Sequence, residues 1–335
     1  MMKKLITMIA MLMMLSAIPV FAETETAPVT IRLAGLKGPT SMGMVKLLKD
    51  AENGETANNY EFTMAGAADE LTPSLLKGDL DILAVPVNLG AVLYGKSQGA
   101  VQMLTVNTLG VIYICENGEE TIQSMEDLKG RTVYATGKGT TPEYTFSYLL
   151  SQHGMELGKD VTVEWKSEPT EVVAQMKAEE GSETSSVGML PQPFVTVAGT
   201  QLSDLHVVLD LTEEWSKLDN GSKFVTGGLI VRKAFADENP EALSVFLEEY
   251  NASTQYVNEN PADAAQLIEE YDIVKAPIAE KAIPFCNIVC VTGTEMQEML
   301  EGYFQVLYDQ DPAAVGGSLP DSGFYRTDLS LDTEQ

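Results

Sequence analysis

Short apolar runs alternate with amphipathic segments along most of the chain, and this alternation predicts an α/β protein. In the first third, strands are expected at 29–34, 60–64, 80–85 and 101–105, with helices at 41–48, 70–77 and 89–96. A strand followed by a helical pattern, repeated in this way, is typical of parallel strands joined by helices.

A second block repeats the pattern, and a helical region follows it. Strands are expected at 110–115, 132–136, 161–165, 186–190 and 205–211, and helices at 124–128, 142–153, 170–177 and just after Pro193. A further strand at 224–231 precedes helices at 240–258, 261–271, 277–283 and 294–308, with no clear strand among them. This order predicts two lobes, with the last helices packed back on the first block.

The predicted boundaries place residues 23–109 and 226–335 in lobe I and residues 110–225 in lobe II. The chain then crosses between the lobes twice, near 107–110 and near 223–228. Gly227 and Gly228 lie at the second crossing, where glycine either supplies a hinge or permits close packing. Both interpretations stay open from the sequence.

The N-terminus has the features of an export signal. A short basic segment at 1–4 is followed by an apolar run at 5–18 and by Val20-Phe21-Ala22, which suits a signal-peptidase site. The run is short for a bilayer span, which needs about 20 residues, although an uncleaved anchor is the alternative. We expect residues 1–22 to be removed and the protein to be periplasmic or extracellular. The sequence has no lipobox cysteine after the apolar run.

The charge is strongly negative, with 21 Lys and Arg against 49 Asp and Glu, or −28 in total. This balance argues against nucleic acid and anionic membrane surfaces as partners. A cationic ligand stays possible. With two histidines and three cysteines, the sequence offers no metal-ligand cluster, and we interpret the cysteines as structural. No cofactor and no catalytic residue is predicted.

Two strand–loop–helix units about a hundred residues apart carry similar loops. Residues 31–41 and 131–142 each join a strand to a Lys-Gly turn and then to hydroxyl residues where a helix begins. Glycine permits close approach of a ligand, and the first N–H groups of a helix lack internal partners. Two such loops suggest two lobes that hold one ligand between them.

Ligands of open α/β sheets bind beyond the carboxyl ends of the strands, which selects these loops and two others. The ligand-binding candidates are Lys37, Gly38, Pro39, Thr40, Ser41, Asn88, Gly139, Thr140, Thr141, Gln192 and Pro193. The loop at 66–70, Lys138 and Tyr144 are further candidates. Each has a structural alternative, since Ser, Thr and Asn are ordinary N-caps and lysine is ordinarily exposed. Backbone donors and hydroxyls in these loops suit a sulfonate, carboxylate or nitrate, or a flat heterocycle, so the predicted ligand is a small organic molecule or an oxyanion. Since no arginine lies in the loops, the prediction leans slightly toward a neutral or weakly charged organic ligand.

Several strings, in this order, carry a family resemblance: Leu36 to Thr40, Gly78 to Pro86, Met125 to Val133, Leu190 to Phe194, Glu238 to Ala242, Ala282 to Ile288 and Val315 to Pro320. In these the chain resembles bacterial extracytoplasmic substrate-binding proteins of ABC importers, in the group serving nitrate, taurine, alkanesulfonates and thiamine-pyrimidine precursors. The resemblance implies a two-lobed periplasmic-binding-protein fold of type II, with two crossover strands. It also implies a monomer that closes over a small molecule and delivers it to membrane permease subunits.

Two alternatives remain. An exported sensor or scavenger would bind a ligand by the same means and pass it to a receptor. An enzyme is the other class, because a related fold occurs in eukaryotic enzymes that make the thiamine pyrimidine. Neither His153 nor His206 accompanies a Gly-x-Ser-x-Gly elbow, and the Gly137 loop lacks the third glycine of a dinucleotide site. We therefore predict a binding protein and no enzyme.

Overall fold

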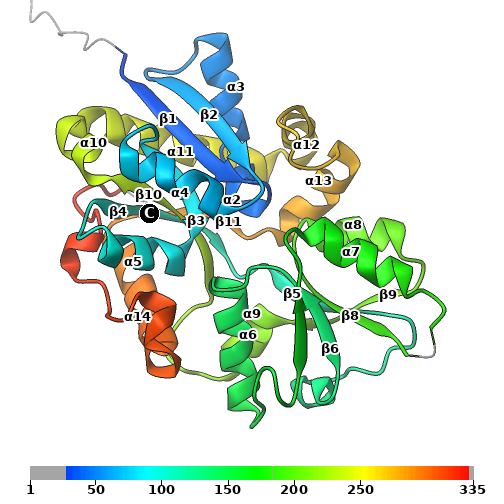
Figure 1. Cartoon of the computed structure of the whole chain (residues 1–335). Coiled ribbons are helices and arrows are strands. Elements are labelled where there is room, and N and C mark those ends of the chain that lie inside the picture. Colours follow the sequence, from blue (N-terminus) through cyan, green and yellow to red (C-terminus); the bar gives the residue numbers. More distant parts are fainter. Residues whose placement is uncertain (1–27, 183, 332–335) are drawn as a thin grey trace, which may run out of the picture.

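The computed structural model describes residues 28–182 and 184–331, which form two α/β units side by side (Figure 1). The predicted signal segment at 1–22 and the predicted mature start at Glu23 lie outside the described residues. Within the described part, no helix is long and apolar enough to cross a bilayer.

Lobe I is built on a six-stranded mixed sheet. Its spatial order is β11 (Ile288–Val291), β4 (Val101–Leu109), β10 (Val225–Arg232), β3 (Ile82–Pro86), β1 (Thr30–Leu36) and β2 (Asn59–Ala65). Strand β1 pairs in parallel with β2 and β3, whereas β10 runs antiparallel to β3 and β4. The β1–β3 strands therefore end at one edge of the sheet, as their strand–helix alternation predicts.

Most of the helices belong to lobe I. They are α2 (Pro39–Met42), α3 (Val45–Asn53), α4 (Ala68–Lys77), α5 (Val87–Lys96), α10 (Lys233–Glu238), α11 (Pro240–Glu259), α12 (Pro261–Glu270), α13 (Ala276–Ala282) and α14 (Gly293–Gln310). Short 3₁₀ turns follow at Ile283–Phe285, Pro312–Val315 and Ser322–Phe324. Helices α11 and α12 pack on α3. The expected packing of the helical C-terminal part on lobe I is therefore confirmed.

Lobe II is built on a five-stranded mixed sheet. Its order is β7 (Thr162–Trp165), β6 (Thr132–Ala135), β8 (Ser186–Pro191), β5 (Ile112–Asn117) and β9 (Leu205–Asp210). The 3₁₀ turn Met125–Leu128 and the helices α6 (Thr141–Gln152), α7 (Pro169–Ala178), α8 (Phe194–Gln201) and α9 (Leu211–Lys217) surround it. Strands β6, β7 and β8 run in parallel, and β5 is antiparallel to β8 and β9.

The chain passes between the two sheets twice, from β4 to β5 and from α9 to β10. These two crossings confirm the predicted type II architecture. Apolar side chains fill the seam near the second crossing, where the Trp215 ring on α9 lies 5.3 Å from that of Tyr303 on α14. Helix α14 also packs on α6, so one hydrophobic cluster is continuous through both lobes.

Two local predictions were wrong. The C-terminal region contains a strand, β11, which pairs with β4 through Ile288 and Val291. Its four residues lie among helical patterns, outside the strand–helix alternation, and the pairing itself stabilises the strand. The single helix expected at 41–48 is instead α2 and α3, interrupted at Gly43, where an added Cβ would lie 2.9 Å from Ile288 Cγ2. The interruption between α2 and α3 therefore lies where the chain packs tightly against Ile288.

Candidate functional site

The carboxyl ends of the parallel strands of both sheets face the boundary between the lobes, and the predicted ligand-binding residues lie there. Lys37 and Gly139 are exposed and Thr140 is half-buried. The remaining candidates are buried: Gly38, Pro39, Thr40, Ser41, Asn88, Thr141, Gln192 and Pro193. Polar residues on loops are seldom buried without a specific use, so each hydrogen bond matters.

Several polar groups of the lobe I loop are bonded to other groups of the protein. Gly38 precedes α2 with a φ of 155°, which is disfavoured for residues with a Cβ. Ser41 turns its hydroxyl back to the Leu36 carbonyl at 2.6 Å, and its backbone N–H donates to the Gly38 carbonyl. Lys37 Nζ lies 3.3 Å from Asp272 Oδ2 at the surface. Ser41 and Lys37 are thus partnered within the protein.

Thr40 is placed differently from its neighbours. Its carbonyl accepts from Asn107 Nδ2 at 2.9 Å, and its methyl Cγ2 would lie 2.5 Å from a Cβ added to Gly227. The methyl group therefore faces β10. Among the described residues, Thr40 Oγ1 has no hydrogen-bond partner. The contact of this hydroxyl with a ligand stays a prediction.

Asn88 and Thr141 join the two lobes directly. Thr141 Oγ1 at the start of α6 donates to Asn88 Oδ1 at 3.1 Å, and Asn88 Nδ2 donates to the Ala314 carbonyl at 3.0 Å. Both side chains are fully buried. The structure thus brings together two residues that the sequence assigned to separate loops, and it gives them an inter-lobe contact.

The lobe II loop closes on itself. Gly139, with a φ of 75°, donates its backbone N–H to the Glu143 carboxylate, and Thr140 Oγ1 donates to the Gly137 carbonyl at 2.7 Å. Lys138 is exposed beside them. A carboxylate at the first turn of a helix also interacts favourably with the helix dipole. The Gly139 N–H, which the sequence suggested as a donor to a ligand, therefore donates to Glu143.

Gln192 and Pro193 connect β8 to α8. Gln192 Oε1 accepts from Thr196 Oγ1 at 2.9 Å, and a cis peptide bond joins Gln192 to Pro193. Both residues lie at the predicted edge of the lobe II sheet. Their contact with a ligand stays a prediction, as it does for every candidate in the site.

Sequence reasoning missed several residues at this boundary. Tyr113 on β5 donates its hydroxyl to the Phe285 carbonyl at 3.4 Å, and the Phe285 ring is 56% exposed. Asn287, with a φ of 45°, donates Nδ2 to the Gly110 carbonyl and accepts from the Leu109 N–H at 3.1 Å. The only sequence signal was a Cys-Asn string after Pro284, which gave no indication of its place in the fold.

The histidines lie away from the lobe boundary, and burial keeps two of the cysteines as neutral thiols. His153 Nδ1 contacts Glu126, and His206 lies between Glu120 and Asp204, in each case away from the lobe boundary. Burial raises the pKa of the Cys290 thiol to about 11 and that of Cys286 further. In the described ranges, no group of three or more His, Cys, Asp or Glu is arranged to hold a metal ion.

Comparisons with known proteins bear on both family and fold. Residues 26–309 match a family model named VitK2_biosynth and described as menaquinone biosynthesis. Among curated proteins, no sequence matches.

Solved structures with the same fold include proteins of ABC transporters. An ABC transporter protein from Parabacteroides distasonis is 22% identical, with 89% of this chain and 98% of that one covered and a TM-score of 0.72. The aliphatic sulphonate-binding protein SsuA of Escherichia coli is 14% identical, with 87% and 96% covered and a TM-score of 0.66. The nitrate-binding protein NrtA of Synechocystis PCC 6803 is 16% identical, with 75% and 69% covered and a TM-score of 0.59. The resemblance to substrate-binding proteins is therefore confirmed at the level of the fold.

Proposed function

The chain belongs to the menaquinone-biosynthesis family named VitK2_biosynth, and we propose that it is an extracytoplasmic solute-binding protein. It captures a small molecule between its two lobes and delivers it to an ABC importer. The observation that carries this proposal is the contact between Asn88 of lobe I and Thr141 of lobe II at the carboxyl ends of their strands. A fold whose lobes meet through polar side chains at that edge is suited to enclosing a polar solute.

The proposed lobes are residues 23–109 with 226–335 and residues 110–225, and they close as rigid bodies about the two crossings. Ligand binding shifts the equilibrium toward closure only if the ligand contacts both lobes when they are shut. The protein acts as an exported monomer, periplasmic or extracellular, and its partners are the permease subunits. The solved ABC-importer proteins of the same fold support this assignment.

The family description raises a second function, an enzyme of menaquinone biosynthesis. General acid–base catalysis needs a titratable group within reach of the substrate. Amides and hydroxyls bond at the lobe boundary through Asn88, Thr141 and Asn107, and the nearby Glu143 carboxylate accepts the Gly139 N–H. Such groups hold and orient a ligand, so binding is the function that this geometry favours.

A thermal-shift screen of residues 23–335 tests the proposal. The panel holds thiamine pyrimidines, flavins, alkanesulfonates, taurine, nitrate, bicarbonate and simple amines. A compound at 100 times its dissociation constant stabilises the folded state by about 2.7 kcal/mol, which raises Tm by several degrees. One class of compounds that binds and is recovered unchanged supports a binding protein, whereas recovery of a converted compound supports the enzyme.

A further inference from the structure

The arginines of this chain are all engaged far from the lobe boundary. The sequence contains four, Arg32, Arg131, Arg232 and Arg326. Arg32 and Arg232 both pair with Asp81, which directly precedes β3, at 2.7 and 3.0 Å. This carboxylate lies at the amino end of a strand whose carboxyl end meets the boundary, so the pair occupies the opposite edge of the sheet.

The other two arginines lie at the same kind of edge. Arg131 precedes β6 and pairs with the buried Glu116 at 2.9 Å. Arg326 contacts Gln102 near the start of β4 and pairs with Asp237 and Asp328 at 3.2 and 2.9 Å. No arginine therefore reaches the boundary to make a bidentate contact with a sulfonate, nitrate or carboxylate.

Some of the backbone donors at the boundary are committed within the protein. In lobe I, Pro39 has no N–H, and the Ser41 N–H donates to the Gly38 carbonyl. In lobe II, the Gly139 N–H donates to the Glu143 carboxylate, which places a negative charge where an anionic ligand would bind. An oxyanion entering this loop would have to displace Glu143 against the repulsion of its charge.

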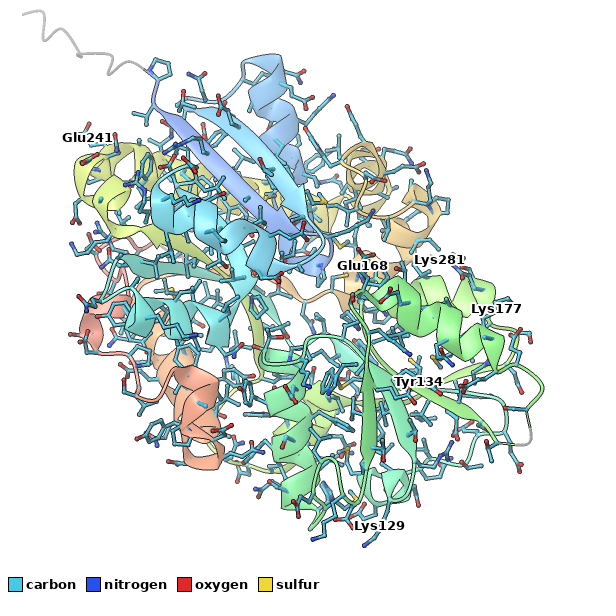
Figure 2. All side chains as sticks on the ribbon, viewed as in Figure 1. Lys129, Tyr134, Glu168, Lys177, Glu241 and Lys281 are labelled. Atoms are coloured by element: carbon cyan, nitrogen blue, oxygen red, sulfur yellow. The ribbon has the colours of Figure 1, made fainter. Side chains whose placement is uncertain are left out.

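The rim of the boundary adds to the negative potential. A Cβ placed on Gly66 of lobe I would lie 3.0 Å from Glu168 Oε1 of lobe II and 3.6 Å from Glu70 Oε1. The two carboxylate oxygens are therefore at most 6.6 Å apart, the sum of those distances. Figure 2 shows Glu168 where lobe II approaches lobe I. The rim lysine Lys37 is paired with Asp272.

We propose that the binding site between the lobes rejects oxyanions and takes an uncharged or cationic organic ligand, with Glu143 as the residue that sets this selectivity in lobe II. This inference rests on the proposed function, because it assigns the chemistry of the same site. It separates this protein from its structural neighbours SsuA and NrtA, whose names specify sulphonate and nitrate. Uncharged ligands with N–H or O–H donors would instead find the Thr40 hydroxyl and the Glu143 carboxylate as acceptors.

The test is a titration of residues 23–335 with nitrate, sulfate and methanesulfonate, in which calorimetry and thermal shift measure binding. Wild type should bind none of the three at millimolar concentration. Glu143→Ala frees the Gly139 N–H and removes the charge, so at least one of these anions should bind it measurably, with an affinity at least roughly tenfold above the upper limit set by the wild-type titration. Glu143→Gln removes the charge but retains an acceptor for that N–H, so its gain should be smaller.

Asp127→Ala is the matched control. Asp127 is also a carboxylate in the first turn of a short helix, where it accepts from the Gln123 and Ser124 N–H groups at 2.9 Å, but it lies before β6 at the far edge of lobe II. The Asp127→Ala substitution therefore removes one negative charge and one capping carboxylate, as Glu143→Ala does.

Three results would overturn the proposal: micromolar anion binding by wild type, no gain in Glu143→Ala, or an equal gain in Asp127→Ala. If no uncharged or cationic compound of the solute panel binds, the proposed function fails separately, since the anion comparison needs no knowledge of the natural ligand.

Discussion

Gly227→Ala distinguishes a packing role from a hinge role for the glycine pair on β10. The added Cβ would lie 2.5 Å from Thr40 Cγ2 and 2.9 Å from Asn107 Oδ1, whereas ordinary contacts begin at 3.4 Å. Thr40 must therefore move by about 0.9 Å, or β10 must yield by that amount. Neither Gly227 nor Gly228 has a positive φ, so the backbone alone does not require glycine here.

Overpacking of this size costs about 1–3 kcal/mol in a tightly packed interior. For a chain of this length, that destabilisation corresponds to a fall in Tm of roughly 2–6 °C. Differential scanning calorimetry of the unliganded protein measures it. The double variant Gly227→Ala with Thr40→Ser removes the closest methyl group and should recover about half of the loss, because the Asn107 contact remains.

Gly95→Ala serves as the control, because an added Cβ there meets nothing within 4 Å and the residue lies inside α5. It should leave Tm unchanged or raise it slightly. An unchanged Tm in Gly227→Ala, combined with weaker ligand-induced closure, would refute the packing argument and support the hinge.

Three further predictions follow from single contacts. Thr40→Val keeps the methyl group against β10 but deletes the free hydroxyl. The affinity for the first compound found in the screen should therefore fall by about 2–10-fold, as measured by titration calorimetry, with little change in Tm. Tyr303→Phe leaves the buried Thr145 Oγ1 without its 2.8 Å partner and should cost about 1–3 kcal/mol by urea unfolding, part of which Thr145→Val restores. Burial raises the pKa of Asp81, but hydrogen bonds from Arg32 and Arg232 outweigh it and lower that pKa. The ionised Asp81 carboxylate therefore contributes its full stabilisation of the folded state above the pKa that Asp has in the unfolded chain, about 3.9, and this contribution is lost as the pH falls further. The difference in Tm between wild type and Asp81→Asn should accordingly narrow below about pH 4.

The order of the main strands and helices could be predicted from the hydrophobic periodicity of the sequence. The alternation of strand and helix patterns in residues 29–231 was strong enough to place both sheets and the two crossings, since each element is long and its neighbours are sequential. β11 was missed because its four residues lie among helical patterns, outside the strand–helix alternation that marked the equally short β6 and β7. It pairs with β4. Local sequence cannot report a partner almost two hundred residues away.

The sequence placed the candidate residues after the strands, but it did not predict the contacts that they make. The rule about carboxyl ends of strands selected Asn88 and Thr141 separately, yet it could not show that they bond to each other. The Lys-Gly loops suggested free N–H donors, whereas the structure shows Pro39 without one and Glu143 accepting the one at Gly139. The place of Phe285 beside Tyr113 depends on how the C-terminal segment returns to the boundary, and no local pattern encodes that return.

The central claim is that the protein holds a small solute between its lobes without changing it. The most direct measurement is a titration of residues 23–335 with the compound that gives the largest thermal shift, followed by mass spectrometry of the compound recovered from the denatured complex. The account predicts one equivalent bound, weaker binding to Thr40→Val, and recovery of the unaltered compound. A chemically altered compound, or equal binding to wild type and Thr40→Val, would contradict it.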